Sequence, residues 1–341
     1  MLDRTLYIDR TGAFALDRLS CLRNEYAKNE CEECLTHCSE NAFVFEQGKL
    51  RLSTVCTQCG ACMGACPTKA LSLYGFSIEK VFESIVKEGN VTLSCQGEMH
   101  CLGALSVDEW CALLLEGKSF SCTLLECASS CQHNHAGVVE QSIRKRIEEA
   151  NAFVAALHKN ERITIVTHKP QEPSRRAFFK RLVTPAITTT SHFSEAPLTH
   201  LKRALKKTVS QSVTVENFSF LYPKAILQSC DNCKECVQFC PTHALSFNTQ
   251  QSDILFQVGK CIGCGICETI CHKEAIQTIE KEVDVIDFAY DRAQVLLRHD
   301  LQVCHTCKCA FSYKGGEKIC ERCACFEKEH SEMFLLASQS H

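Results

Sequence analysis

The spacing of the cysteines constrains this chain more than any other feature. Three runs separate four successive cysteines by two, two and three residues, and they begin at Cys56, Cys230 and Cys261. A loop with a thiolate at every third position can wrap three of them onto one face of a [4Fe–4S] cluster, while the fourth cysteine binds the neighbouring cluster. The three runs therefore predict pairs of iron–sulfur clusters rather than a disulfide framework.

Length and composition favour a metalloprotein of a reducing compartment. The chain has 341 residues and 28 cysteines, and this length is typical of about two or three domains. Such a cysteine density in a small secreted protein would indicate disulfides, but the residues after Met1 do not resemble a signal peptide. No apolar run approaches the roughly 20 residues that cross a bilayer. We therefore predict a cytoplasmic protein with no membrane span.

Residues 1–75 are predicted to form a bacterial ferredoxin-like module with two [4Fe–4S] clusters, here called the first module. Its first half is irregular, because nine residues separate Cys21 from Cys31. Three cysteines still precede a remote fourth, so pairing across the halves is retained. One cluster is assigned to Cys21, Cys31, Cys34 and Cys66, and the other to Cys56, Cys59, Cys62 and Cys38. Cys21 is the least regular of these ligands, and the alternative is that it is a bystander.

Two further features of the first module are informative. The residues on either side of Gln47-Gly48 alternate as in a β-hairpin. The segment from Cys21 to Phe43, in which a Cys-Leu-Arg element precedes the first regular run, resembles the opening of ferredoxin-type electron-transfer proteins of the NapF-like group. That resemblance implies a role in electron transfer.

Residues 222–285 repeat the unit with regular spacing and form the predicted second module. One cluster is assigned to Cys230, Cys233, Cys236 and Cys271, and the other to Cys261, Cys264, Cys267 and Cys240. His272 stands where proline would follow the last cysteine. It either lies near a cluster sulfur, where it would tune the reduction potential, or faces solvent. A second hairpin is expected within residues 244–256.

Residues 76–168, the middle domain, have the pattern of a small α/β fold. Short β-prone runs at 91–95, 120–127 and 162–167 alternate with predicted helices at 107–115 and 137–158. Apolar residues in the second helix recur every three or four positions, which predicts one buried face. Because strands that alternate with helices form parallel sheets, we expect a small parallel sheet here.

The middle domain carries six cysteines. Cys111 and Cys122 fall inside predicted elements and are expected to be core thiols. Cys95, Cys101, Cys127 and Cys131 fall at element ends, where a parallel sheet gathers its ligands. These four thiols either bind a further iron–sulfur cluster, bind zinc, or bind no metal. His133 and His135 are alternative ligands.

Parts of the middle domain resemble a known iron–sulfur subunit. Residues 101–105 and 113–137, with a Cys-x-Gly element and a loop of paired cysteines, are similar to the delta subunit of methyl-viologen-reducing hydrogenase. That subunit links the hydrogenase to heterodisulfide reductase, so the resemblance implies an electron-transfer centre. The extended N-terminal cysteine pair of that family is reduced here to Cys95.

Residues 169–221 are predicted to form a basic linker with a short helix near residues 201–207. It either is solvated or provides a docking surface for an acidic redox partner. Residues 286–341 are predicted to form a helix and a cysteine-rich tail. The tail cysteines of a zinc-ribbon-like site are Cys304, Cys307, Cys320 and Cys323. Rubredoxin-like iron, a further cluster or free thiols are the alternatives, since Cys309 and Cys325 lie beside the pairs.

Together these features predict an α+β multidomain protein. Two ferredoxin-like modules would flank a small α/β domain, and a zinc-ribbon-like tail would follow. No phosphate-binding loop and no catalytic triad is evident, so no catalytic residue is assigned. We predict an electron carrier with about four [4Fe–4S] clusters, a subunit or partner of a hydrogenase, formate dehydrogenase or heterodisulfide-reductase type of complex. The alternative is an oxidoreductase with thiol, disulfide or sulfur chemistry at Cys127 and Cys131. A nucleic-acid partner is not expected.

Overall fold

The computed structural model describes residues 7–26, 28–88, 92–95, 101–117, 119–134, 137–167 and 196–330. It divides into two compact units. The first comprises Met1–Tyr222, Val258–Gly265 and Glu280–Arg292, and the second comprises Pro223–Gln257, Ile266–Ile279 and Ala293–His341. Within the described residues, no helix combines the length and apolar character that crossing a membrane requires.

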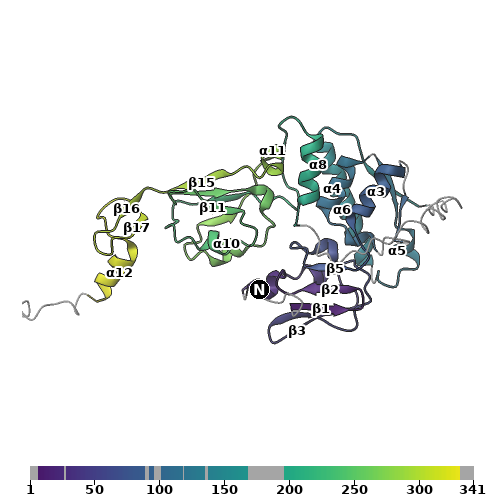
Figure 1. Ribbon diagram of the computed structural model, residues 1–341, viewed down its shortest axis with the longest axis horizontal. Coiled ribbons are helices and arrows are strands. Elements are labelled where there is room, and N and C mark those ends of the chain that lie inside the picture. Colours follow the sequence, from purple (N-terminus) through teal and green to yellow (C-terminus); the bar gives the residue numbers. More distant parts are fainter. Residues whose placement is uncertain are drawn as a thin grey trace, which may run out of the picture. The chain divides into compact units, whose positions relative to one another are not determined.

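Short strands build the first module. The strands β1 (Ile8–Thr11), β2 (Phe14–Asp17) and β5 (Leu71–Leu73) form an antiparallel sheet in the order β1-β2-β5 (Figure 1). The strands β3 (Phe43–Glu46) and β4 (Lys49–Leu52) pair antiparallel, which confirms the predicted hairpin. Gln47 and Gly48 have φ values of 51° and 73°, as a two-residue turn between such strands requires. The first two strands were not predicted from the sequence.

The nine-residue gap after Cys21 is anchored to the hairpin. The short helix α1 (Leu22–Glu25) occupies part of this gap. The buried Asn24 side chain donates to Leu50 O at 3.0 Å and accepts from Leu50 N at 2.6 Å. These two bonds dock the inserted helix on β4. A helix α2 (Glu33–Thr36) and a 3-10 turn η2 (Met63–Ala65) complete the module.

The middle domain contains the predicted parallel sheet. The strands β6 (Thr92–Leu93), β7 (Phe120–Thr123) and β8 (Ile163–Val166) pair parallel in the order β6-β7-β8. The predicted strand at 120–127 is too long, because Leu124 leaves the extended conformation and α5 (Leu125–Ser129) follows. The other elements are α3 (Ile78–Glu88), the 3-10 turn η3 (Leu102–Ala104), α4 (Val107–Glu116) and α6 (Val138–Ala156).

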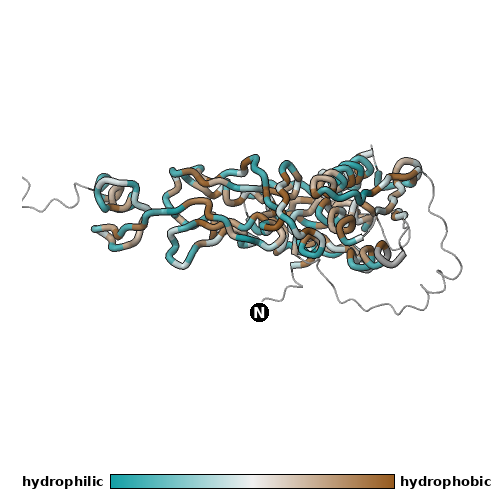
Figure 2. Tube along the Cα trace, turned by 90° about the horizontal axis from the view of Figure 1, so that it is seen from above, coloured by the Kyte–Doolittle hydropathy of each residue, from teal (hydrophilic) through white to brown (hydrophobic). Residues whose placement is uncertain are grey.

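Helix packing forms the core of the first unit. The buried face of α6 includes Val139, Ile143, Ile147, Ala150 and Val154, which confirms the predicted periodicity. The turns of the helices in Figure 2 alternate between hydrophobic and hydrophilic residues, as expected for helices with one buried face. Cys111 and Cys122 are fully buried, so both are core thiols as predicted.

The helix predicted near residues 201–207 is present as α8 (Thr199–Thr208). It packs against α4, which also packs against α6 (Figure 1). Leu201, Ala204 and Leu205 are buried because they share one face of the helix. This stretch is therefore part of the core of the first unit and not a solvated linker. Residues 169–195 of the predicted linker lie outside the described residues. The strands β9 (Thr214–Val215) and β14 (Val283–Asp284), the 3-10 turn η5 (Val258–Lys260) and α11 (Val285–Ala289) also belong to the first unit.

The second unit is built from antiparallel strands. The strands β10 (Lys224–Ile226) and β13 (Ile276–Thr278) pair with each other, and β11 (Leu245–Phe247), β12 (Asp253–Phe256) and β15 (Gln294–Arg298) form a second sheet. The β11–β12 pair confirms the second predicted hairpin. The short helices are α9 (Glu235–Gln238) and α10 (Ile266–Ile270). The tail contributes β16 (Leu301–Val303), β17 (Ala310–Ser312) and α12 (Glu321–Glu329).

Candidate metal centres

The fourth cysteine of every run is followed by the same backbone conformation. The third residue after it is left-handed in each case, at Asn41, Lys69, His243 and Glu274, with φ values of 50°, 54°, 52° and 49°. Left-handed residues other than glycine are uncommon, so four of them at equivalent positions indicate a repeated loop. Ser39 and His272 replace proline in two of the loops, and the conformation does not depend on that proline.

The residue after each left-handed position is a buried alanine. These residues are Ala42, Ala70, Ala244 and Ala275, each 1% exposed. Three of their amides donate to the sulfur of the preceding fourth cysteine: Cys38 at 3.4 Å, Cys66 at 3.3 Å and Cys271 at 3.2 Å. Such N–H···S bonds stabilise negative charge on a thiolate and help to set cluster potentials. The loops therefore suit thiolate ligands.

The first three cysteines of each regular run also lie on a common loop. Gln58, Asn232 and Gly263 are left-handed between the first and second cysteines, with φ values of 62°, 63° and 67°. Gly60, Lys234 and Gly265 are left-handed directly after the second, with φ values of 77°, 73° and 71°. In the irregular run, Glu32 follows Cys31 with a φ of −126°. The first half of the first module thus reaches its ligands by a different path.

The structure brings the first assigned set of thiols together. Burial raises the pKa of Cys34, and the neighbouring thiolates of Cys66, Cys21 and Cys31 raise it further. The pKa of Cys21 is likewise raised by burial and by Cys66 and Cys31. Cys21 therefore lies with the other three thiols and not apart from them.

The second set of the first module converges as well. Burial raises the pKa of Cys62, and so do the thiolates of Cys59, Cys34, Cys38 and Cys56. Cys59, Cys38 and Cys56 are its partners in the assigned set, whereas Cys34 belongs to the first set. The two sets therefore adjoin at Cys34 and Cys62.

The surroundings of these eight thiols fit iron–sulfur clusters. Phe14, Leu16, Phe43, Leu50 and Leu71 form an apolar core against which Cys21, Cys38, Cys56 and Cys66 pack. An apolar shell limits access of solvent and tunes the potential of a bound centre. Burial raises the pKa of six of these thiols, so metal binding there must displace protons, as ligation by thiolates requires; they are Cys21, Cys31, Cys34, Cys56, Cys59 and Cys62.

In the second unit, one assigned set lies together. Burial raises the pKa of Cys236 to about 12, with further contributions from Cys230, Cys233, Cys267 and Cys271. Cys230, Cys233 and Cys271 are its assigned partners, and Cys267 belongs to the other set. The assignment of Cys261, Cys264, Cys267 and Cys240 rests on spacing, since these residues belong to different units.

His272 lies at the solvent edge of this set. Its Nε2 is 3.0 Å from Asp231 Oδ2, and its side chain is 50% exposed. One ring nitrogen is also within 4.8 Å of Cys233 Sγ, in a group that includes Glu235. His272 was expected either to lie near a cluster sulfur or to face solvent. Its ring lies near the Cys233 thiol and also faces solvent.

Three of the middle-domain thiols, Cys95, Cys101 and Cys127, also lie close together. Cys95 Sγ lies 4.0 Å from Cys127 Sγ. Hydrogen bonds from Cys101 and Cys127 lower the pKa of Cys95 to about 3, and Cys95 in turn raises the pKa of each partner. Backbone amides support this group, since Leu102 N donates to Cys95 Sγ at 3.4 Å. Cys131 lies near Cys127, whose pKa it also raises. A set of thiols thus gathers at the predicted place.

The predicted alternative ligands do not join this group. His133 Nδ1 is 3.4 Å from Glu40 Oε1 and 3.2 Å from Thr57 Oγ1, so its ring contacts the first module instead. His135 lies outside the described residues.

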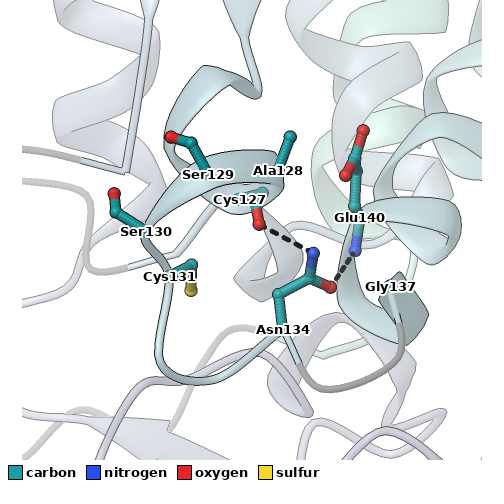
Figure 3. A pocket seen from close by; sticks show the side chains of 8 residues that line it. All are labelled: Cys127, Ala128, Ser129, Ser130, Cys131, Asn134, Gly137 and Glu140. Atoms are coloured by element: carbon teal, nitrogen blue, oxygen red, sulfur yellow. Dashed lines mark hydrogen bonds between the residues drawn. The ribbon is translucent and has the colours of Figure 1, made fainter.

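A cavity of about 500 Å³ opens beside the middle-domain thiols (Figure 3). It is lined by Cys127, Ala128, Ser129, Ser130, Cys131, Asn134, Gly137 and Glu140. The side chain of Asn134 connects two parts of this lining, because it donates to Cys127 O at 2.8 Å and accepts from Glu140 N at 3.1 Å. The lining is mostly polar, and two of its residues are cysteines.

The tail thiols are spaced for a single metal ion. The sulfurs of Cys304, Cys307, Cys320 and Cys323 lie within 4.8 Å of one another. A tetrahedral zinc ion with Zn–S bonds of about 2.3 Å would separate its sulfurs by about 3.8 Å, and Cys307 Sγ lies 3.7 Å from Cys320 Sγ. Hydrogen bonds from backbone amides, first of Cys320 and then of Cys307, lower the pKa of Cys304 to about 6.

Two details of the tail support this arrangement. Lys308 follows Cys307 with a φ of 61°, the left-handed conformation that glycine would adopt more readily. Cys309 and Cys325 are exposed and do not belong to the group of four. The tail thus brings four cysteine sulfurs within 4.8 Å of one another, close enough to surround one metal ion.

Comparison with protein families agrees with this geometry. A model of the 4Fe-4S dicluster domain matches residues 222–272, and a model of the 4Fe-4S binding domain matches residues 53–72. No curated protein matches the chain. The chain therefore carries two ferredoxin-type 4Fe-4S domains in a mixed α/β structure, and these domains indicate an iron–sulfur protein of electron transfer. The irregular run that begins at Cys21 precedes the matched residues of the first module.

Proposed function

We propose that this protein carries electrons through four [4Fe–4S] clusters as a subunit or dedicated partner of a larger cytoplasmic redox complex. One observation carries the proposal: the two thiol sets of the first module adjoin at Cys34 and Cys62. In the second unit, Cys267, which is assigned to the other set, likewise lies near Cys236. Two adjoining centres let an electron pass through a module instead of stopping in it.

The chemistry of a bound cubane is the gain and loss of one electron. The chain supplies everything else. Cysteine thiolates would hold the iron, the amides of Ala42, Ala70 and Ala275 donate to three of the sulfurs, and apolar side chains around the first module exclude water. These are the means by which a protein sets cluster potential. No side chain of the protein has to make or break a covalent bond.

The partner is proposed from sequence resemblance. The NapF-like opening and the likeness of the middle domain to the delta subunit of methyl-viologen-reducing hydrogenase favour a complex of the hydrogenase, formate dehydrogenase or heterodisulfide-reductase type. The convergence of Cys95, Cys101 and Cys127 supports an additional iron–sulfur cluster in the middle domain, with Cys131 as the fourth ligand. The sulfur spacing in the tail supports a structural zinc ion in a zinc-ribbon-like fold.

Electron transfer can be tested with one ligand variant in each module. Cys59→Ser and Cys264→Ser each remove one assigned thiolate. Both variants are expected to keep their circular dichroism spectrum and to lose electron transfer from reduced methyl viologen to an acceptor protein. Cys309→Ser, which removes an exposed thiol outside every assigned set, is the matched control. Undiminished transfer in both module variants would refute the proposal.

The cavity beside Cys127 and Cys131 favours a second candidate function. A thiol, disulfide or sulfur substrate could enter there, with electrons supplied by the ferredoxin modules. However, Cys127 is 5% exposed and its pKa is raised, first by Cys95 and then by burial, which does not suit a nucleophile. Rapid alkylation of both thiols in the reduced, metal-loaded protein would favour this enzyme, and protection of both would favour a metal site.

A further inference from the structure

Two loops, one from the first module and one from the middle domain, approach each other closely at Gly64 and Gly103. The turn η2, which follows Cys62, contacts η3, which follows Cys101. A Cβ atom on Gly64 would overlap Leu105 O and Gly103 O. On the other side, a Cβ atom on Gly103 would lie 3.2 Å from Ala61 O. The close approach of the two loops therefore depends on these glycines.

A buried cation lies at the same contact. Arg146, on α6, is 8% exposed and donates from Nη1 to Gly103 O at 2.8 Å and to Leu105 O at 3.1 Å. A Cβ atom on Gly64 would also overlap this nitrogen. The guanidinium group thus touches both loops. A buried charge is costly unless it has partners, so its position calls for an explanation in terms of what surrounds it.

The groups that act on Arg146 include one thiol from each of two sets. Burial lowers the pKa of Arg146, and the nearby groups that offset this effect are Cys101, Glu109, Glu33 and Cys62. Cys101 belongs to the middle-domain set and Cys62 to the second set of the first module. Cys101 is also within electrostatic reach of Cys59, which helps to raise its pKa, although Cys95 and burial contribute more. Thiols of the two sets therefore lie on the two sides of this contact, within electrostatic reach of each other and of Arg146.

We propose that the Gly64–Gly103 contact is the electron junction between the first module and the middle domain, with Arg146 as the positioning residue that stabilises the reduced state on either side. The proposal rests on the proposed function, because it requires centres on Cys38, Cys56, Cys59 and Cys62 and on the middle-domain thiols. One electron leaves one centre and one arrives at the other. No bond or proton moves with it, and no further reactant is needed.

A cation beside a cluster favours the more negative, reduced form by direct electrostatics. Replacement of Arg146 by an apolar residue should therefore shift the potential of the adjoining clusters to more negative values. If Arg146 served only to tie the loops through its hydrogen bonds, restoring the charge without those bonds would not restore the wild-type potential. The lysine variant separates these roles, since Arg146→Lys keeps the charge but not the paired hydrogen bonds.

The experiment uses the full chain, loaded and purified without oxygen, in six forms. These are the wild type, Arg146→Met, Arg146→Lys, Gly64→Ala, Cys101→Ser and the control Arg144→Met, which removes an arginine that is 44% exposed on the same helix. Iron and sulfide content are measured first. EPR spectra recorded during a redox titration then give the midpoint potentials and the spin–spin broadening between clusters.

The proposal predicts broadened signals in the wild type that sharpen in Gly64→Ala, because the added methyl group separates the loops. It predicts a negative shift of potential in Arg146→Met, recovery in Arg146→Lys and no change in Arg144→Met. The junction is refuted if Gly64→Ala keeps the wild-type broadening, or if Arg146→Met has wild-type potentials. It is also refuted if Cys101→Ser removes no iron, whereas the proposed four-cluster function fails only if the module cysteines hold none. If Arg146→Met does not fold, the result for Gly64→Ala decides the test.

Discussion

A buried ion pair joins the first module to the middle domain, and its removal should be costly. Lys69, three residues after Cys66, extends its ammonium group to Glu109 of α4, with Nζ 3.0 Å from Oε1. The two side chains are only 10% and 6% exposed. Lys69 Nζ also donates to Ser106 Oγ at 2.7 Å. We predict that Lys69→Met destabilises the protein strongly, because it leaves the Glu109 carboxylate buried without its cation.

The magnitude follows from what Glu109 retains. Breaking a buried pair by removing one partner costs about 3–5 kcal/mol. Glu109 keeps two bonds, because Ser106 N donates to Oε2 at 2.8 Å and Ser106 Oγ at 2.9 Å. These bonds go to a charged acceptor and partly compensate for the loss. The expected loss in the free energy of unfolding is therefore near the lower end, about 3 kcal/mol.

The loss in the free energy of unfolding in Lys69→Met should also depend on pH. In the wild type, burial favours the neutral form of Glu109, but Lys69 and Ser106 outweigh it and hold the pKa below its ordinary value. The stability contributed by this carboxylate is present above its unfolded pKa and is lost as the pH falls through the folded pKa. In Lys69→Met the pKa is instead raised by burial, so the penalty is relieved at acid pH. The difference between the two proteins should be smaller at about pH 5 than at about pH 8.

Urea unfolding of the loaded protein, followed by the emission of the single tryptophan, measures this difference. Trp110 is fully buried and adjacent to Glu109, so its emission reports on α4. The matched control is Lys207→Met. Lys207 pairs at 3.1 Å with Glu116, which lies on α4 as Glu109 does, but the Lys207 side chain is 58% exposed. That variant should lose less than about 1 kcal/mol. Equal losses in the two variants, or a loss in Lys69→Met that grows toward acid pH, would refute the reasoning.

Two further predictions concern the tail and the irregular run. Cys320→Ser should abolish about one bound zinc per chain and leave the iron content unchanged; loss of iron together with the zinc, in atomic analysis, would contradict the tail assignment. Asn24→Ala removes both bonds to Leu50 and should cost about 1–3 kcal/mol. It should also lower iron incorporation at the set that includes Cys21. Asn151→Ala, which removes a similar pair of bonds to Ile163, should cost a similar amount and spare the iron.

The sequence predicted those parts of the structure that depend on local spacing. The two hairpins, the parallel sheet and the stripe on α6 were predicted because turn residues and apolar periods are short-range signals. The strand at 120–127 was predicted too long, because the pattern of so short a segment does not separate the end of a strand from the start of the helix Leu125–Ser129. The strands β1 and β2 were missed because neither alternates as a half-buried strand would: Ile8–Thr11 is mostly polar, and Phe14–Asp17 is buried along its whole length.

Long-range contacts account for what else the sequence did not show. The pairing of Lys69 with Glu109 spans 40 positions, and no local pattern marks either residue as buried. Asparagine is usually exposed, and Asn24 is buried only because it bonds to Leu50 of β4. The convergence of Cys95 with Cys101 and Cys127 was expected from element ends in a parallel sheet. The Arg146 contact could not be predicted, because it depends on how α6 packs over η3.

The central claim is that cysteines of both modules hold cubane clusters, and elemental analysis of anaerobically purified protein tests it most directly. Four clusters require about 16 iron atoms and as many acid-labile sulfides per chain, with any middle-domain cluster in excess. The reduced protein should also show EPR signals of interacting clusters. Colourless protein without acid-labile sulfide, even after reconstitution with iron and sulfide, would contradict the account.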